Sequence, residues 1–249
     1  MVFEEHGKEN SRTVLLLHGG GLGPWSCADA ARNLGEHFRV IVPTLDGHGG
    51  ADAPFCGITE NASRLIEYID SKLGGKVALI SGLSLGGQIL LEALSKRPDI
   101  CDFAIIESAS VIPTPAFIRS LLKPSVEMSY PLISKRWFAL LQFRYLRIRD
   151  DLFEDYYADT SRIDKNNMTA FIDGSIAYSL PLKLSEVKAR TIVVAGGREM
   201  RSVLKSAEMI SSAIPSSTLE VKKGLRHGEW SINKTTEYSE YIKALLSHK

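Results

Sequence analysis

The chain has 249 residues, of which 44% are hydrophobic and 24% charged, and its formal net charge is +1. This composition excludes a small disulfide-stapled fold and an overall field strong enough to recruit nucleic acid or a membrane surface. The three cysteines are scattered and form no Cys-x-x-Cys pair, which predicts reduced thiols and neither a disulfide framework nor a thiolate zinc site.

The chain begins with residues 1–6, Met-Val-Phe-Glu-Glu-His. This stretch lacks the basic region and the apolar core of a signal peptide. No apolar run elsewhere approaches the ~20 residues that span a bilayer. We therefore expect no membrane span and, by default, a cytoplasmic location.

Short runs rich in Val, Ile, Leu and Ala recur along the chain and predict β-strands. Most are nearly continuous in apolar residues, which is typical of strands covered on both faces. Helical patterns separate most of them, as βαβ units require. The predicted fold class is α/β, with a mostly parallel, doubly wound sheet of about seven strands and helices on both faces. The runs are 13–18, 39–42, 76–81, 103–106, 191–195 and 218–221, after a short first strand and a polar turn at 8–12.

Helices are expected between or after these strands. Residues 59–73 place apolar side chains such as Leu65 and Ile69 on one stripe. Residues 85–97 end in two cations followed by Pro98, which suits a helix C-terminus. The expected core helices are 59–73, 85–97, 202–214 and 235–246.

A long segment, residues 108–186, interrupts this alternation. A structureless loop of that length is uncommon in a compact domain, and the segment carries several helical patterns. We therefore expect an inserted helical lid, or cap, over a core made of residues 1–107 and 187–249. The expected lid helices are 116–122, 135–146, 151–157 and 167–177.

The strongest motif is Gly-Leu-Ser-Leu-Gly at residues 82–86, between a predicted strand and a predicted helix. This is the Gly-x-Ser-x-Gly nucleophile elbow in its strand–turn–helix setting. A serine in so sharp a turn needs small neighbours, and Gly82 and Gly86 carry no side chain that would collide. The helix N-terminus offers free N–H groups to a developing oxyanion. Ser84 is therefore the candidate nucleophile.

A second glycine-rich loop, His-Gly-Gly-Gly-Leu-Gly at residues 18–23, follows the predicted strand at 13–18. In an elbow hydrolase, the backbone N–H groups of Gly20 and Leu85 would form the oxyanion hole. A phosphate-binding loop is the rival interpretation. The loop lacks the Lys-Ser/Thr ending of a P-loop, and its spacing is not Gly-x-Gly-x-x-Gly. His18 is expected to be structural.

Three loops, at residues 18–20, 43–49 and 82–87, together resemble those of the α/β-hydrolase superfamily, and the resemblance covers essentially the whole chain. The middle loop, Pro-Thr-Leu-Asp-Gly-His-Gly, is similar to the family's Asp-x-x-Gly-His-Gly turn, although Thr44 stands where aspartate is common. The resemblance implies the sheet described above, with a helical lid inserted after residue 107. It also implies a structural role for the histidine of this turn, His48.

The family's chain order of nucleophile, acid and histidine assigns the other catalytic roles. Of the two histidines after Ser84, His227 lies in a loop after the last predicted strand, where the family keeps its general base, whereas His248 adjoins the C-terminus. The family usually places the acid just after the penultimate strand, and Glu199 occupies that place. Glu107 is the alternative acid, because it ends an earlier strand from which some members recruit theirs.

These features predict a serine hydrolase that cleaves a small carboxylic ester or a related acyl compound through an acyl-enzyme. A serine at the elbow argues against haloalkane dehalogenase and epoxide hydrolase chemistry, for which the superfamily uses aspartate. Thioesterase, C–C bond hydrolase and lyase chemistry stay open, because fold does not fix function. A rival class is a ligand-sensing receptor with slow turnover. The sequence implies no metal and no cofactor. The expected partner is a small-molecule ester, and no nucleic acid is expected to bind. The sequence leaves the oligomeric state undetermined.

Two features of the predicted lid bear on the substrate. Residues 137–146 concentrate aromatic and aliphatic side chains, which either wall an apolar pocket or attach the lid to the sheet domain. Residues 119–149 are mainly basic and residues 150–164 mainly acidic. We expect the two blocks to pair across adjacent helices, and the alternative is a basic surface for an anionic ester or a lipid.

Overall fold

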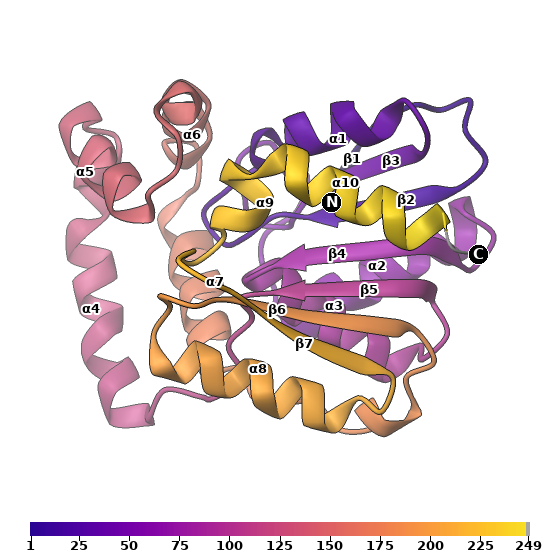
Figure 1. Ribbon diagram of the computed structural model, residues 1–249. Coiled ribbons are helices and arrows are strands. Elements are labelled where there is room, and N and C mark those ends of the chain that lie inside the picture. Colours follow the sequence, from indigo (N-terminus) through magenta and orange to yellow (C-terminus); the bar gives the residue numbers. More distant parts are fainter. Residues whose placement is uncertain (248–249) are drawn as a thin grey trace.

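The computed structural model describes residues 1–247, so His248 lies outside the described residues. Seven strands form one sheet in the order β1-β3-β2-β4-β5-β6-β7 (Figure 1). Strand β1 runs antiparallel to β3, and the other neighbouring pairs are parallel. The predicted mostly parallel sheet of about seven strands is thereby confirmed. The strands are β1 (Val2–His6), β2 (Thr13–Leu17), β3 (Arg39–Thr44), β4 (Val77–Leu83), β5 (Cys101–Glu107), β6 (Arg190–Gly196) and β7 (Ser217–Lys222).

Helices cover both faces of the sheet (Figure 1). Successive side chains of a strand point to opposite faces, so a doubly covered strand is apolar throughout. In β2, Leu15 and Leu17 belong to the core beneath α2, α3 and α8, whereas Val14 and Leu16 belong to the core beneath α1 and α10. The core helices are α1 (Ala28–Gly35), α2 (Ile58–Lys72), α3 (Leu85–Lys96), α8 (Arg201–Ala213), α9 (Glu229–Asn233) and α10 (Thr235–Ser247), with a 3₁₀ turn η1 (Pro24–Cys27).

Helices α2, α3, α8 and α10 lie where the sequence predicts them. Helices α1 and α9 were not predicted. They have only 8 and 5 residues, respectively, so neither repeats an apolar stripe long enough to be read from the sequence.

Four further helices come from the segment between β5 and β6, and Figure 1 shows α4, α5 and α6 standing apart from the sheet. The predicted end of the first of them at residue 122 is wrong, because α4 continues through Pro124 and Pro131. Both prolines are exposed, so water can satisfy the carbonyl groups that they leave unpaired. No helix among residues 1–247 is both long enough and apolar enough to cross a bilayer. The inserted elements are α4 (Ala116–Ile133), α5 (Arg136–Leu146), α6 (Phe153–Thr160) and α7 (Lys165–Ala177), with 3₁₀ turns η2 (Asp150–Leu152) and η3 (Leu184–Glu186).

Candidate active site

Ser84 occupies the sharp turn between β4 and α3. Its φ of 52° and ψ of −110° lie outside the regions that residues with a side chain normally adopt. Its N–H donates to the carbonyl oxygen of Glu107 at 2.8 Å, which ties the turn to β5. A Cβ on Gly82 would lie 2.4 Å from the carbonyl oxygen of Gly86, and a Cβ on Gly86 would lie 2.5 Å from that of Leu17. Close backbone approaches therefore require both glycines.

Two unpaired backbone donors lie next to this turn. The N–H groups of Gly20 and Leu85 make no hydrogen bond within residues 1–247. Leu85 is the first residue of α3, so its N–H is one of the free donors at a helix N-terminus. A Cβ on Gly20 would lie 3.5 Å from Cδ2 of Leu85, which places the two residues side by side. The pair offers the donors that an oxyanion beside Ser84 would need.

Two buried histidines hold the glycine loop in place. His18 donates from Nδ1 to the carbonyl of Gly19 at 2.9 Å, and its Nε2 accepts from a backbone N–H of the loop after β3 at 3.1 Å. His48 donates from Nδ1 to the carbonyl of Asp46 at 3.1 Å and accepts at Nε2 from the N–H of Gly21 at 3.0 Å. Burial lowers the pKa of His18 to about 3 and that of His48 to about 4. Both rings are therefore neutral at neutral pH, and each acts as a fixed hydrogen-bond relay.

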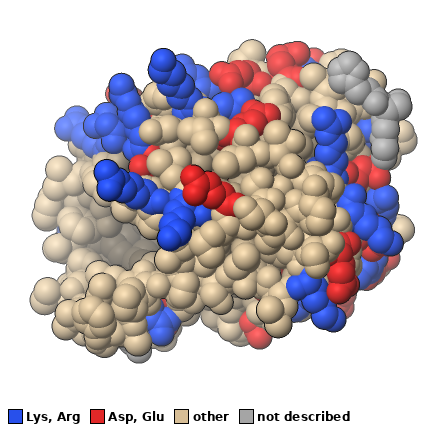
Figure 2. Space-filling view, turned by 60° about the horizontal axis from the view of Figure 1, so that its bottom comes forward, with Lys and Arg blue, Asp and Glu red and all other residues tan. Residues whose placement is uncertain are grey.

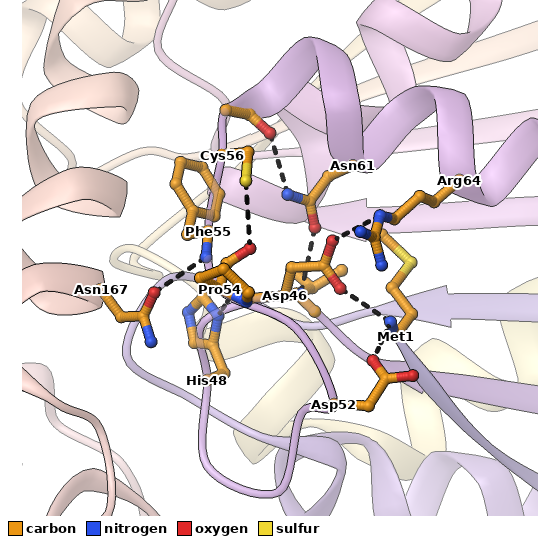
Figure 3. A network of polar contacts seen from close by, with 12 residues as sticks. Met1, Asp46, His48, Asp52, Pro54, Phe55, Cys56, Asn61, Arg64 and Asn167 are labelled. Carbon is orange, nitrogen blue, oxygen red and sulfur yellow. Dashed lines mark hydrogen bonds and ion pairs between the residues drawn. The ribbon is translucent and has the colours of Figure 1, made fainter.

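Figure 3 shows the loop after β3, which carries the second of these histidines. Asp46 in this loop is buried, and its carboxylate accepts from the amino group of Met1 at 2.7 Å and pairs with Arg64 at 3.2 Å. From the inserted helices, the side chain of Asn167 accepts from the N–H of Phe55 at 2.8 Å. The loop that carries His48, and through it holds the glycine loop at Gly21, is thus tied both to the core and to α7.

The two neutral histidines make folding sensitive to acid. The unfolded chain protonates them below about pH 6.5, whereas the folded chain resists protonation down to about pH 4. The unfolded state therefore binds more protons in this range, and the free energy of unfolding falls as the pH falls through it. We expect His48 to contribute a loss on the order of 3 kcal/mol at full effect. Urea unfolding at pH 7.5, 6.0 and 5.0 measures it, and His48→Gln should flatten the dependence. An equal slope in native protein and variant would contradict this.

The loops after β6 and β7 bring a carboxylate and a histidine together. His227 donates from Nδ1 to Oε2 of Glu199 at 2.8 Å. Oε1 of Glu199 accepts from the hydroxyl of Ser108 at 2.6 Å and from the N–H of Gly196 at 2.9 Å. The side chain of Glu199 is 1% exposed, and that of His227 is 45% exposed. Burial acts to raise the pKa of Glu199, but the hydrogen bonds from these three partners outweigh it and hold the pKa below its ordinary value. Glu199 is therefore a carboxylate that orients the imidazole and leaves Nε2 free.

Ser84 and His227 line one cavity of about 90 Å³, together with Gly20. No direct hydrogen bond joins the serine and histidine side chains within the described residues, and such bonds commonly tighten only when a substrate is bound. A larger and more open cavity of about 910 Å³ lies elsewhere, lined by residues of α2, α3 and the chain before η3. None of the predicted catalytic residues lines it, so the smaller cavity is the candidate site.

The alternative acid, Glu107, lies buried and makes no hydrogen bond to His227. Its Oε1 accepts from the N–H of Ser231 at 3.4 Å, and its Oε2 has no partner within residues 1–247. Burial raises the pKa of this carboxyl group to about 7. Of the two acids predicted, the structure brings Glu199 to the histidine.

Ser108 is a residue of this site that was not predicted from the sequence. It follows β5 directly, is 2% exposed and has a φ of 57°, which is unusual for a residue with a side chain. No motif marks it. Only the pairing of β5 with β6 places it against Glu199, and that pairing joins strands far apart in the chain.

The seven-stranded sheet, the serine elbow and the glycine loop together define the class of this protein. A model of the alpha/beta hydrolase family matches residues 14–227, and the chain belongs to this family.

Named relatives differ in their chemistry. The chain is 24% identical over 234 residues to a 2-hydroxy-6-oxo-6-phenylhexa-2,4-dienoate hydrolase of Burkholderia cepacia, covering 87% of this chain and 81% of that one. It is 32% identical over 89 residues to a pimeloyl-[acyl-carrier protein] methyl ester esterase of Aromatoleum aromaticum, covering 36% and 34% of the two chains.

Solved structures share the fold. A thermophilic esterase from Thermogutta terrifontis is 21% identical with a TM-score of 0.81, covering 99% of this chain and 93% of that one. An enol-lactonase from Burkholderia xenovorans is 15% identical with a TM-score of 0.82, covering 99% and 96%.

Proposed function

We propose that the chain is a serine hydrolase that cleaves a small carboxylic ester, or a related acyl compound, through an acyl-enzyme on Ser84. The observation that carries this proposal is the 2.8 Å hydrogen bond from His227 to the buried carboxylate of Glu199, beside the cavity that His227 shares with Ser84. A nucleophile, a base and a group that orients the base are the minimum that this chemistry requires. The relatives named as esterases support the same class of reaction.

The mechanism follows from these roles. Nε2 of His227 removes the Ser84 proton as Oγ attacks the acyl carbonyl, and the N–H groups of Gly20 and Leu85 stabilise the oxyanion. His227 then donates that proton to the leaving alcohol. A water molecule, deprotonated by His227, attacks the acyl-enzyme and releases the acid. Glu199 stays ionised throughout and stabilises the imidazolium.

The inserted helices serve as the lid of this site. Leu146 and Ile148 of the segment 108–186 line the cavity at Ser84. Phe143, on the same stretch, is fully buried in a cluster with core side chains, so one face of α5 attaches the lid while other residues wall the site. A second, mainly apolar cavity of about 480 Å³ adjoins Gly20 beneath these helices and would hold an acyl chain.

Hydrolysis of p-nitrophenyl esters from acetate to hexanoate tests this proposal. We expect kcat/KM to rise with acyl length, by about fourfold for each methylene group that becomes buried, because burial of one methylene contributes ~0.8 kcal/mol. A reactive fluorophosphonate should add once to the protein, and peptide mass spectrometry should place the adduct on Ser84.

Folding is checked by circular dichroism on the same sample. A folded protein that neither hydrolyses any ester of the series nor reacts with the fluorophosphonate would contradict the proposal. That result would favour the ligand-sensing class, in which a retained site binds without rapid turnover.

A further inference from the structure

Three adjoining cavities surround the candidate catalytic residues, and they differ in chemistry. The cavity at Ser84 shares Gly20 with the apolar cavity of about 480 Å³ and shares His227 with a third cavity of about 420 Å³. Leu146 of α5 lines all three. A substrate with its scissile carbonyl at Ser84 would therefore extend into two different environments.

The third cavity is basic. Arg144 and Arg147 reach it from the end of α5, Arg198 from the loop after β6, and Arg226 from the loop after β7. Among the residues that line this cavity, Glu199 is the one carboxylate, and its oxygens already accept from His227 and from two other donors. Figure 2 shows Lys and Arg side chains along the upper edge of the hollow at the left of that view, on the side of the inserted helices.

These four guanidinium groups have no ion-pair partner within residues 1–247, whereas Arg119, Arg136 and Arg149 of the lid are ion-paired. The expected pairing of the basic and acidic blocks holds for Arg136, which binds Glu154, and for Arg149, which binds Asp151. It does not hold for Arg144 and Arg147, which form no ion pair with the described residues of the acidic block and instead line the cavity that His227 also lines. Their hydrogen-bond donors are free for a ligand.

The position of the α5 end is fixed against the core. The side-chain amide of Asn233, at the end of α9, donates to the carbonyl of Arg147 at 2.8 Å and accepts from the N–H of Arg149 at 3.2 Å. Arg147 itself ends the helix in the left-handed conformation, with a φ of 55°. The basic residues of the lid are thus held beside the loop that carries His227.

The positions of His227 and Gly20 also indicate how an ester substrate would be oriented in the site. His227, which protonates the leaving alcohol, lines the basic cavity, whereas Gly20, which donates to the oxyanion, lines the apolar one. The leaving group of an ester lies on the side of the acid that protonates it. The basic cavity therefore receives the alcohol portion, and the apolar cavity receives the acyl portion.

We propose that the substrate is an ester of an apolar acid with an alcohol that carries an anionic oxygen group, a carboxylate or a phosphate, bound by Arg144, Arg147, Arg198 and Arg226. This inference rests on the proposed ester hydrolysis. The planar guanidinium group matches both anions through paired N–H donors. The cavity adjoins the catalytic histidine and has a limited volume, which suits an anionic group on the substrate itself.

A matched pair of esters tests the inference: 4-butyryloxybenzoate, which is anionic, and its neutral isostere 4-butyryloxybenzamide. We expect the native protein to favour the anionic ester by about tenfold in kcat/KM, and the preference to weaken as salt is added. The double variants Arg144→Gln/Arg147→Gln and Arg198→Gln/Arg226→Gln should each bring the ratio towards one. Arg162→Gln is the matched control, because Arg162 is an exposed lid arginine that lines none of the three cavities, and it should keep the native ratio.

Competitive inhibition distinguishes the two anions. If 4-hydroxybenzoate inhibits and inorganic phosphate does not, the site binds a carboxylate. If inorganic phosphate inhibits more strongly than 4-hydroxybenzoate, the site binds a phosphate. Hydrolysis of both esters with a ratio near one, unchanged in the variants, overturns the inference while the proposed function stands. If the protein hydrolyses neither ester, both the proposed function and this inference are overturned.

Discussion

Replacing Ser84 by alanine is expected to lower kcat for p-nitrophenyl butyrate by on the order of 10³-fold or more, with little change in the folded structure. Without the Oγ nucleophile no acyl-enzyme can form, and only the oxyanion donors and the binding cavities remain to favour direct attack by water. Alanine introduces no larger side chain at a position with a φ of 52°, so the strained turn itself should persist. Steady-state kinetics and thermal unfolding of the purified variant measure both effects.

Ser125→Ala provides the matched control for this experiment. Ser125 is an exposed serine on α4 whose hydroxyl bonds only to the carbonyl of Leu121 in its own helix. We expect this variant to keep the native activity and to react completely with the fluorophosphonate. Turnover by Ser84→Ala within about tenfold of the native value would exclude the acyl-enzyme mechanism, since such an effect is far below the loss of a nucleophile.

The central part of the site could be predicted from the sequence because its constraints are local. Ser84, Gly82 and Gly86 lie in one turn, and Gly82 is required by its close approach to Gly86 four residues further on, although Gly86 in addition approaches Leu17 of β2. The candidate oxyanion donors, the N–H groups of Gly20 and Leu85, belong to glycine-rich segments that can be recognised in the sequence. The sheet was likewise predictable, because strands covered on both faces are apolar throughout.

Other features depend on contacts between distant segments, which no local pattern reveals. Ser108 meets Glu199 only because β5 and β6 are neighbours in the sheet. The arginines that line the basic cavity come from the end of α5 and from the loops after β6 and β7, which lie much later in the chain. The sequence therefore shows a run of arginines in the inserted segment, but it does not show that this run lies near Arg198 and Arg226. Because acidic residues follow this run in the inserted segment, ion pairs between the two blocks are the simpler prediction. In the structure, Arg136 and Arg149 form such ion pairs, whereas Arg144 and Arg147 do not.

Chain order leaves open which of two glutamates is the acid, and the surroundings of the two buried side chains distinguish them. Glu199 and Glu107 both end or follow neighbouring strands, and both side chains are buried. Glu199 receives donors at both oxygens, which stabilise its charge and hold its pKa below the ordinary value against the effect of burial. Glu107 has one weak donor and an unpartnered oxygen, so burial prevails and raises its pKa to about 7.

We therefore expect the substitutions Glu199→Gln and Glu107→Gln to have very different effects on kcat. Glu199→Gln keeps the shape of the side chain but removes the charge, so it favours the wrong imidazole tautomer and no longer stabilises the imidazolium. We expect kcat at pH 7.5 to fall by about 10²- to 10⁴-fold. Glu107→Gln changes a side chain that makes no hydrogen bond to Ser84 or His227 and accepts only from the N–H of Ser231 at 3.4 Å, so kcat should stay within about threefold of the native value.

The two variants control for each other, because each places the same amide in a buried position at the same edge of the sheet. Thermal unfolding shows whether both remain folded, and titration of active sites with the fluorophosphonate separates a catalytic loss from a structural one. A purely structural role for Glu199 would lower the number of active sites without lowering kcat per titrated site, whereas loss of the charge that orients His227 should lower kcat per titrated site. A large loss in Glu107→Gln with a small one in Glu199→Gln would assign the acid to β5 and would require the His227–Glu199 hydrogen bond to be a structural contact.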